Sequence, residues 1–238
     1  MSSLRRFLKN LADNLILTRS KDSRPFTVIV EGNIGSGKTT FLNYFKKFKE
    51  ICVLSEPIEL WRDCKGHNLL SYMYADPRQW SLTFQSYVQL TMLNHHTLPT
   101  DCPIKMIERS IYSARYCFVE KMMRDGILSE PSAAVIDAWF QWLTRNTAVK
   151  VDHIVYLRSQ PEVVYQRMLE RNRPEEKPIS LEFLQSLHQL HEEWLYDKVS
   201  HHCPATVSII DANLDLELVK QECEKINEKT LNPRKIII

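Results

Sequence analysis

The sequence lacks a strong charge of either sign and any long apolar run. Its 238 residues carry 31 Lys and Arg against 29 Asp and Glu, a net charge of +2 at pH 7. No basic stripe of the kind that follows a nucleic-acid backbone is present, so nucleic acid is not a predicted partner. No apolar run reaches the ~18 residues that a membrane span needs, so a membrane is not a predicted partner either.

The six cysteines also lack the paired spacing of a disulfide or zinc framework. No Cys-x-x-Cys occurs among them, and in a chain of this length they are predicted to be reduced thiols in a reducing compartment. The histidine pairs His188/His191 and His201/His202, the latter beside Cys203, match neither His-Glu-x-x-His nor a complete zinc ligand set. A zinc hydrolase is therefore not predicted.

Residues 1–25 differ from the rest of the chain because they are basic, rich in serine and periodically apolar. The apolar side chains at helical spacing are Leu4, Phe7, Leu8, Leu11 and Leu15. Such a segment is typical of a mitochondrial transit peptide, and a solvated helix or tail is the alternative. The first reading predicts the mitochondrial matrix and the second the cytoplasm. Pro25 marks the start of a single predicted domain, residues 26–238.

Five short runs are apolar nearly throughout, as strands buried on both faces of a sheet should be. They are FTVIVE (26–31), ICVLSE (51–56), IKMIE (104–108), HIVYLR (153–158) and ATVSIID (205–211). The segments between them are long enough for crossover helices. This pattern predicts an α/β fold with a five-stranded parallel sheet wrapped by helices.

The clearest predicted helix covers residues 77–96. Its apolar stripe consists of Trp80, Phe84, Val88 and Met92 at every fourth position. Gln85 lies on the side that carries Val88 and Met92. From the helix alone, Gln85 is interpreted as the polar edge of a core helix.

A phosphate-binding loop follows the first predicted strand. The stretch EGNIGSGKTTF (31–41) contains G-x-x-x-x-G-K-[ST], from Gly32 to Thr39, between that strand and a predicted helix KTTFLNYFKKF (38–48). Backbone N–H groups of such a turn surround phosphate oxygens, and the dipole of the next helix adds positive potential. Lys38 supplies a cation toward the β- and γ-phosphates, and Thr39 offers a hydroxyl for Mg²⁺. The loop predicts nucleotide binding but leaves the phosphate acceptor open.

Charged residues at the ends of the next two strands are candidates for the acceptor side. Glu56 ends the second predicted strand in SEPIELW, and Glu108 and Arg109 end the third in MIERS. Ligands of open α/β sheets collect beyond the carboxyl ends of the strands, where a carboxylate can take a proton from an attacking hydroxyl. Each glutamate alone would also fit a surface charge or a helix cap, but two acids and an arginine together favour chemistry.

The loop RNRPEEKP (171–178) is strongly charged and bounded by prolines. It holds Arg171 and Arg173 and follows Arg167. Arginines on a mobile loop can close over phosphates as charge develops. The alternative is a solvated loop that carries charges of both signs.

Together these segments resemble the deoxyribonucleoside kinase family, nearest to its thymidine- and deoxycytidine-preferring branch. The matching stretches run in family order: EGNIGSGKTT, SEPIELW, NLLSYMYADP, FQSYVQLTML, ERSIYSARYCFVE, YLRSQPEVVYQRMLERNRPEE and LHQLHEEWL. The combination of ERS-x-x-SARY with the lid R-x-R-x-E-E is highly specific. The resemblance implies the P-loop kinase fold with a short arginine-bearing lid, a homodimer, and ATP and Mg²⁺ as cofactors.

The resemblance also implies roles on the phosphate side. Glu56 would be the general base that takes the proton of the nucleoside 5′-hydroxyl, and Arg109 would orient that hydroxyl and offset nearby charge. Thr39 and Glu108 would hold Mg²⁺. The ATP-binding residues would be Gly32, Asn33, Ile34, Gly35, Ser36, Gly37, Lys38, Thr39, Thr40, Arg167, Arg171, Arg173, Asp211, Ala212 and Asn213. The last three belong to a looser match, DANLDLE (211–217).

On the nucleoside side, Tyr74 and Glu176 would hydrogen-bond the sugar 3′-hydroxyl, and Gln85 would pair with the base between Phe118 and Trp61. The rest of the pocket would be lined by Ile34, Met73, Phe84, Val88, Met92 and Ala114. The Gln85 amide matches N3–H and O4 of thymine and, when flipped, N3 and the N4 amine of cytosine.

Other branches of the family place an arginine and an aspartate where Met92 and Ala114 stand, so this chain has room for a 5-methyl group. The predicted activity is ATP-dependent phosphorylation of deoxynucleosides at the 5′-hydroxyl, with thymidine and deoxycytidine preferred and purines used less. A nucleoside monophosphate kinase is disfavoured because Glu56 would repel an acceptor phosphate. A P-loop subunit that has lost transfer is disfavoured because Arg109, Thr39 and Arg171 are also present.

Overall fold

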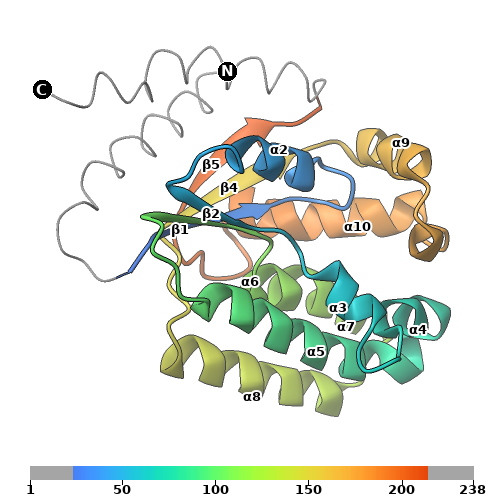
Figure 1. Cartoon of the computed structure of the whole chain (residues 1–238). Coiled ribbons are helices and arrows are strands. Elements are labelled where there is room, and N and C mark those ends of the chain that lie inside the picture. Colours follow the sequence, from blue (N-terminus) through green and yellow to red (C-terminus); the bar gives the residue numbers. More distant parts are fainter. Residues whose placement is uncertain (1–23, 214–238) are drawn as a thin grey trace, which may run out of the picture.

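The computed structural model describes residues 24–213 (Figure 1). The predicted N-terminal segment, up to residue 23, and residues 214–217 of the DANLDLE stretch lie outside the described residues. Within the described part of the chain, no helix has both the length and the apolar character that crossing a membrane requires.

Five parallel strands form one sheet, as predicted. They are β1 (Phe26–Glu31), β2 (Ile51–Leu54), β3 (Ile104–Glu108), β4 (His153–Arg158) and β5 (Thr206–Asp211), in the order β2-β3-β1-β4-β5. The central strand β1 pairs with β3 on one side and with β4 on the other. The carboxyl ends of these three strands therefore lie next to one another.

The prediction that the second strand reaches Glu56 is wrong. Pairing of β2 with β3 ends at Leu54, opposite Ile107. Pro57, which cannot donate a backbone hydrogen bond, precedes the short helix α3 (Ile58–Arg62). Glu56 consequently lies in the turn beyond the strand, where its backbone N–H donates to Glu108 at 3.3 Å.

The helices cover both faces of the sheet. The longer ones are α2 (Lys38–Phe45), α5 (Pro77–Thr97), α8 (Glu130–Asn146), α9 (Pro161–Arg171) and α10 (Leu181–His191). Shorter ones are α4 (Leu69–Ala75), α6 (Ile111–Ser113), α7 (Glu120–Arg124), the π-helical turns η1 (Ala114–Val119) and η3 (Glu192–Tyr196), and the 3₁₀ turn η2 (Pro174–Glu176). The predicted helix 77–96 is confirmed. It begins at Pro77 because the Asp76 side chain accepts from the Gln79 N–H.

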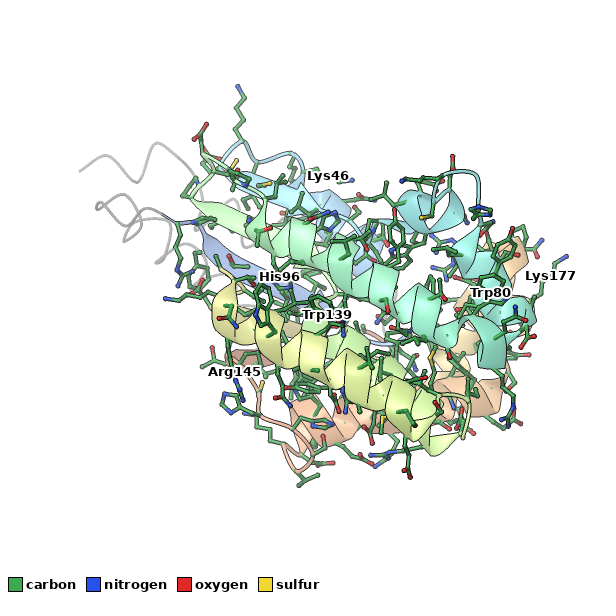
Figure 2. The ribbon with its side chains drawn as sticks, turned by 90° about the horizontal axis from the view of Figure 1, so that it is seen from below. Lys46, Trp80, His96, Trp139, Arg145 and Lys177 are labelled. Atoms are coloured by element: carbon green, nitrogen blue, oxygen red, sulfur yellow. The ribbon has the colours of Figure 1, made fainter. Side chains whose placement is uncertain are left out.

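Alternate residues of β1 belong to two hydrophobic cores. Val28 and Val30 pack with Phe41 and Leu42 of α2 on one face. Ile29 faces the opposite core, to which α5, α8 and α10 contribute. Figure 2 shows α5 and α8 side by side on that second face. A parallel sheet covered on both faces explains why the strands are apolar nearly throughout.

Candidate active site

A cavity of about 750 Å³ lies at the carboxyl ends of the central strands. Its walls come from the phosphate-binding loop and α2, the turn after β2, α3 to α5, the end of β3, and the segment 167–183. A smaller cavity of about 50 Å³ shares Glu56, Trp61, Gln85 and Arg109 with it. The smaller cavity therefore marks the deep end of one continuous site.

The phosphate-binding loop is held in a backbone conformation that requires glycine. Gly35 has a φ of +80°, and a Cβ there would lie 2.6 Å from the Val164 carbonyl oxygen of α9. The Asn33 side chain connects the loop to α10, because its Nδ2 donates to the Leu184 carbonyl and its Oδ1 accepts from the Ile34 N–H. The N–H groups ahead of α2 thus form the turn that the motif predicts.

Lys38 is buried and contacts the loop itself. Its Nζ donates to the carbonyl oxygens of Gly32 at 3.2 Å and Asn33 at 2.7 Å. Burial, followed by the nearby Arg109 charge, lowers the pKa of Lys38 from 10.5 to about 7. An anion at the loop would compensate that desolvation, so the site is electrostatically prepared for phosphate.

Two carboxylates, a hydroxyl and a guanidinium meet beside the loop. Thr39 Oγ1 donates to Glu108 Oε1 at 2.7 Å. Arg109 Nη1 donates to the Gly32 carbonyl at 3.0 Å, and its Nε lies 3.0 Å from Glu56 Oε1, without the alignment of a hydrogen bond. Burial raises the pKa of Glu56, whereas the Arg109 charge opposes that rise. A carboxylate with a raised pKa is a better base near neutral pH.

Arg109 is held in this place by its backbone and by Phe118. Its φ of +61° is the left-handed conformation, which costs a non-glycine residue about 1–3 kcal/mol. The guanidinium carbon lies 4.7 Å from the centre of the Phe118 ring. The next residue, Ser110, caps α6 and donates from Oγ to Glu31 Oε1 at 2.6 Å. Sequence reasoning missed Glu31, although a carboxylate directly before Gly32 is a visible signal.

The deep end of the site is aromatic and carries one amide. Trp61 and Phe84 meet edge to face with ring centres 5.6 Å apart, and Trp61 Nε1 donates to Thr91 Oγ1 at 2.9 Å. Gln85 is buried, and its Oε1 has no hydrogen-bond partner among residues 24–213. Its Nε2 has a weak contact with Met122 Sδ at 3.8 Å. The amide is therefore available to a ligand. The small cavity at this end is also lined by Val88, Met92 and Ala114.

The predicted lid follows α9, where Asn172 ends the helix with a φ of +51°. Arg171 Nη2 donates to both carboxylate oxygens of Glu176, at 2.6 and 2.7 Å, and Arg173 lies 3.4 Å from the same side chain. Burial, and next the Glu176 charge, raise the pKa of Tyr74. Glu176 therefore contacts the arginines of the lid, and its charge acts on the hydroxyl of Tyr74 in α4.

Most of the predicted site residues line one of the two cavities. The ones that do not are Gly32, Asn33, Ser36, Asp211, Ala212 and Asn213. Arg167 nevertheless connects the segment 211–213 to the site, because its Nη1 donates to the Ala212 carbonyl at 2.8 Å. Cavity residues that sequence reasoning missed include Arg62, Lys121, Met122, Glu175 and Phe183.

No group of three or more His, Cys, Asp or Glu side chains that could hold a metal ion occurs between residues 24 and 213. Thr39 and Glu108 nevertheless place two oxygen atoms together beside the phosphate-binding loop. Oxygen is the ligand type that Mg²⁺ takes, and one carboxylate with a nucleotide's phosphates is a common set.

Comparison with known proteins identifies the family. The Deoxynucleoside kinase family matches residues 28–233. The chain belongs to the deoxynucleoside kinase family. It is 46% identical to "Thymidine kinase 2, mitochondrial" of Macaca fascicularis over 215 residues, which cover 90% of this chain and 81% of that protein. The human protein of the same name is 47% identical over 87% of this chain and 78% of that protein. "Deoxycytidine kinase 2" of Gallus gallus is 32% identical over 87% of this chain and 90% of that protein.

Membership makes this deoxynucleoside kinase an ATP-dependent phosphotransferase, as the sequence predicted, and the five-stranded parallel sheet is consistent with the predicted P-loop kinase fold. The phosphate donor of the family is ATP. The 750 Å³ cavity is thus the candidate site of a kinase, with the phosphate-binding loop at one end and Gln85 at the other.

Proposed function

We propose that this deoxynucleoside kinase transfers the γ-phosphate of ATP to the 5′-hydroxyl of thymidine and deoxycytidine, in nucleotide salvage, with purines used less. The observation that carries this proposal is the Glu56–Arg109 pair, 3.0 Å apart, between the phosphate-binding loop and the buried Gln85 amide. Glu56, as a general base in that position, would have the phosphates on one side and the nucleobase on the other. The relatives named thymidine kinase and deoxycytidine kinase support the same acceptors.

Glu56 takes the proton of the 5′-hydroxyl as the γ-phosphate is transferred, and Arg109 orients that hydroxyl and offsets charge. The raised pKa of Glu56 suits this role, because it brings the carboxylate nearer to the working pH. Lys38, Arg171 and Arg173 stabilise the phosphate charge. Thr39 and Glu108 would hold Mg²⁺, which would supply positive charge that offsets the charge of the ATP phosphates.

Specificity follows from the deep end of the site. Within residues 24–213 no group holds the Gln85 oxygen, so the amide can present either edge to a pyrimidine at the cost of no more than the weak Nε2 contact with Met122 Sδ. Tyr74 and Glu176 receive the sugar 3′-hydroxyl. The small cavity beside Met92 and Ala114 gives the 5-methyl group of thymine an apolar place.

We also propose that the protein is a homodimer through α5 and α8. These helices lie side by side (Figure 2) and expose large apolar side chains. The exposed fractions are 52% for Leu90, 50% for Val135, 56% for Trp139 and 54% for Trp142. The last three recur at positions i, i+4 and i+7 of α8, so they share one face. An exposed apolar face of this kind marks a protein interface.

A phosphate-transfer assay with ATP, Mg²⁺ and each of the four deoxynucleosides tests the proposed activity. Wild type should phosphorylate thymidine and deoxycytidine fastest, and Glu56→Gln should lower kcat by roughly 10²–10⁴-fold with ATP binding retained. Glu59→Gln is the matched control, because that side chain is 83% exposed on the next helix. Bound ATP without transfer to any nucleoside would favour a subunit that has lost catalysis, and transfer only to a monophosphate would favour a nucleoside monophosphate kinase.

A further inference from the structure

The lid presents two consecutive carboxylates to different partners. Glu176 pairs with Arg171 and Arg173 of the lid itself. Glu175 instead pairs with Arg62, which lies 113 residues earlier on α3. The second contact joins the lid to the opposite wall of the cavity, which both residues line.

The Arg62–Glu175 contact has the geometry of a strong ion pair. Nε donates to Oε1 at 2.7 Å and Nη2 donates to Oε2 at 3.1 Å, so two bonds run in parallel. The Glu175 side chain is only 12% exposed and that of Arg62 29%. The remaining Arg62 nitrogen, Nη1, donates to Glu59, which is 83% exposed and contributes little because water screens it.

The two residues stand next to the groups proposed to bind the nucleoside. Arg62 directly follows Trp61 at the end of α3, and Glu175 directly precedes Glu176. The turn η2 also packs against α4, the helix that carries Tyr74. A pair that fixes η2 against α3 therefore fixes Glu176 relative to Tyr74.

The two hydrogen bonds of the pair do not involve the arginines that would serve ATP, although the Arg173 charge also acts on Glu175. Phosphates that draw Arg171 and Arg173 away would deprive Glu176 of the cations that it contacts here. Arg62 does not contact those arginines, and its two bonds to Glu175 would persist.

We propose that Arg62 and Glu175 are positioning residues, whose ion pair holds the lid against α3 so that Glu176 meets the 3′-hydroxyl of the nucleoside. This inference rests on the proposed function, because it concerns how the same acceptor is held. It adds two residues that touch neither the base nor the transferred phosphate.

The test compares thymidine with its 3′-deoxy analogue, which lacks the hydroxyl that Glu176 would bind. At saturating ATP, kcat/KM is measured for wild type, Arg62→Gln, Glu175→Gln, the double variant and the control Glu59→Gln. Each single variant should lower kcat/KM for thymidine about fivefold to tenfold, the size expected of one charge-assisted pair that is partly screened. The double variant should have a kcat/KM for thymidine no lower than that of either single variant. For the 3′-deoxy analogue, kcat/KM should change less than twofold in every variant.

Other outcomes overturn the inference. An equal fall for both nucleosides would mean that the pair stabilises the fold without positioning Glu176. The two residues do not act through each other if kcat/KM for thymidine does not fall in the single variants, or if their losses add in the double variant. The same conclusion follows if Glu59→Gln lowers kcat/KM by as much. Unchanged turnover of the 3′-deoxy analogue also shows that each variant is folded. A wild-type protein that phosphorylates neither nucleoside would instead refute the proposed function.

Discussion

Glu31 allows a prediction of stability whose size follows from its burial. The side chain is fully buried, Oε1 accepts from Ser110, and Oε2 has no hydrogen-bond partner among the described residues. Burial raises the pKa of Glu31 from 4.5 to about 7. Each pKa unit corresponds to ~1.4 kcal/mol, so the change amounts to about 3 kcal/mol.

The sign follows from the proton that the two states bind. Below pH 4.5 both the folded and the unfolded chain keep the Glu31 proton, and the full stability is present. As the pH rises toward 7, the unfolded chain releases the proton while the folded chain retains it, so the free energy of unfolding falls. Above pH 7 both states are ionised and the loss is complete.

Glu31→Gln removes this titration. Its amide oxygen can still accept from Ser110, and any cost of the new NH₂ group does not depend on pH. The free energy of unfolding of the variant, relative to wild type, should therefore rise by about 2.5 kcal/mol between pH 5 and pH 8.

Urea unfolding, followed by tryptophan fluorescence and circular dichroism at a series of pH values, measures this difference. Glu59→Gln, which changes an exposed carboxylate in the same way, is the control variant. A Glu31→Gln difference that stays constant from pH 5 to pH 8 would refute the reasoning, because it would mean that Glu31 titrates normally in the folded protein.

Three more predictions concern the loop, the lysine and the dimer. Gly35→Ala should abolish ATP binding in an equilibrium titration, because its Cβ would meet a carbonyl oxygen at 2.6 Å; Gly66→Ala, with a similar φ of +89° and open space, should bind ATP normally. ATP binding near pH 7 should take up protons and weaken as the pH rises, because phosphate raises the pKa of Lys38 from about 7. Calorimetry in buffers of different ionisation enthalpy measures this uptake, and its absence would contradict the assignment. Trp139→Ser with Trp142→Ser should convert the proposed dimer to a monomer in sedimentation, and a monomeric wild type would contradict the proposed interface.

The elements of the fold could be predicted because their signals are local. Runs such as 153–158 are apolar nearly throughout since both faces of the sheet are covered. The apolar residues at every fourth position of 77–96 match a helix with one buried side. The strand order could not be predicted, because the pairing of β1 with β3 and β4 is decided by tertiary packing. The predicted end of β2 was wrong because the run was extended over the polar residues Ser55 and Glu56 up to Pro57, whereas pairing with β3 stops at Leu54.

The candidate site also has a part that could be predicted from the sequence and a part that could not. The phosphate-binding loop has a fixed spacing, so its position and flanking elements could be read from the sequence. Ion pairs between distant segments have no such signal. Arg62 and Glu175 are 113 residues apart, and Glu31 and Ser110 are 79 apart. Only the folded chain shows that these side chains are partners.

The central position of β1 has a consequence for how this kinase can change. Glu56, Trp61, Gln85 and Arg109, all proposed to serve the acceptor, follow β2 or β3, whereas Arg167, proposed to serve ATP, follows β4. Selection for a new acceptor can act on the continuous segment 55–118 and leave the donor half of the sheet untouched. That segment is a natural unit for exchange between relatives, and the lid is the part that would need to be matched to it.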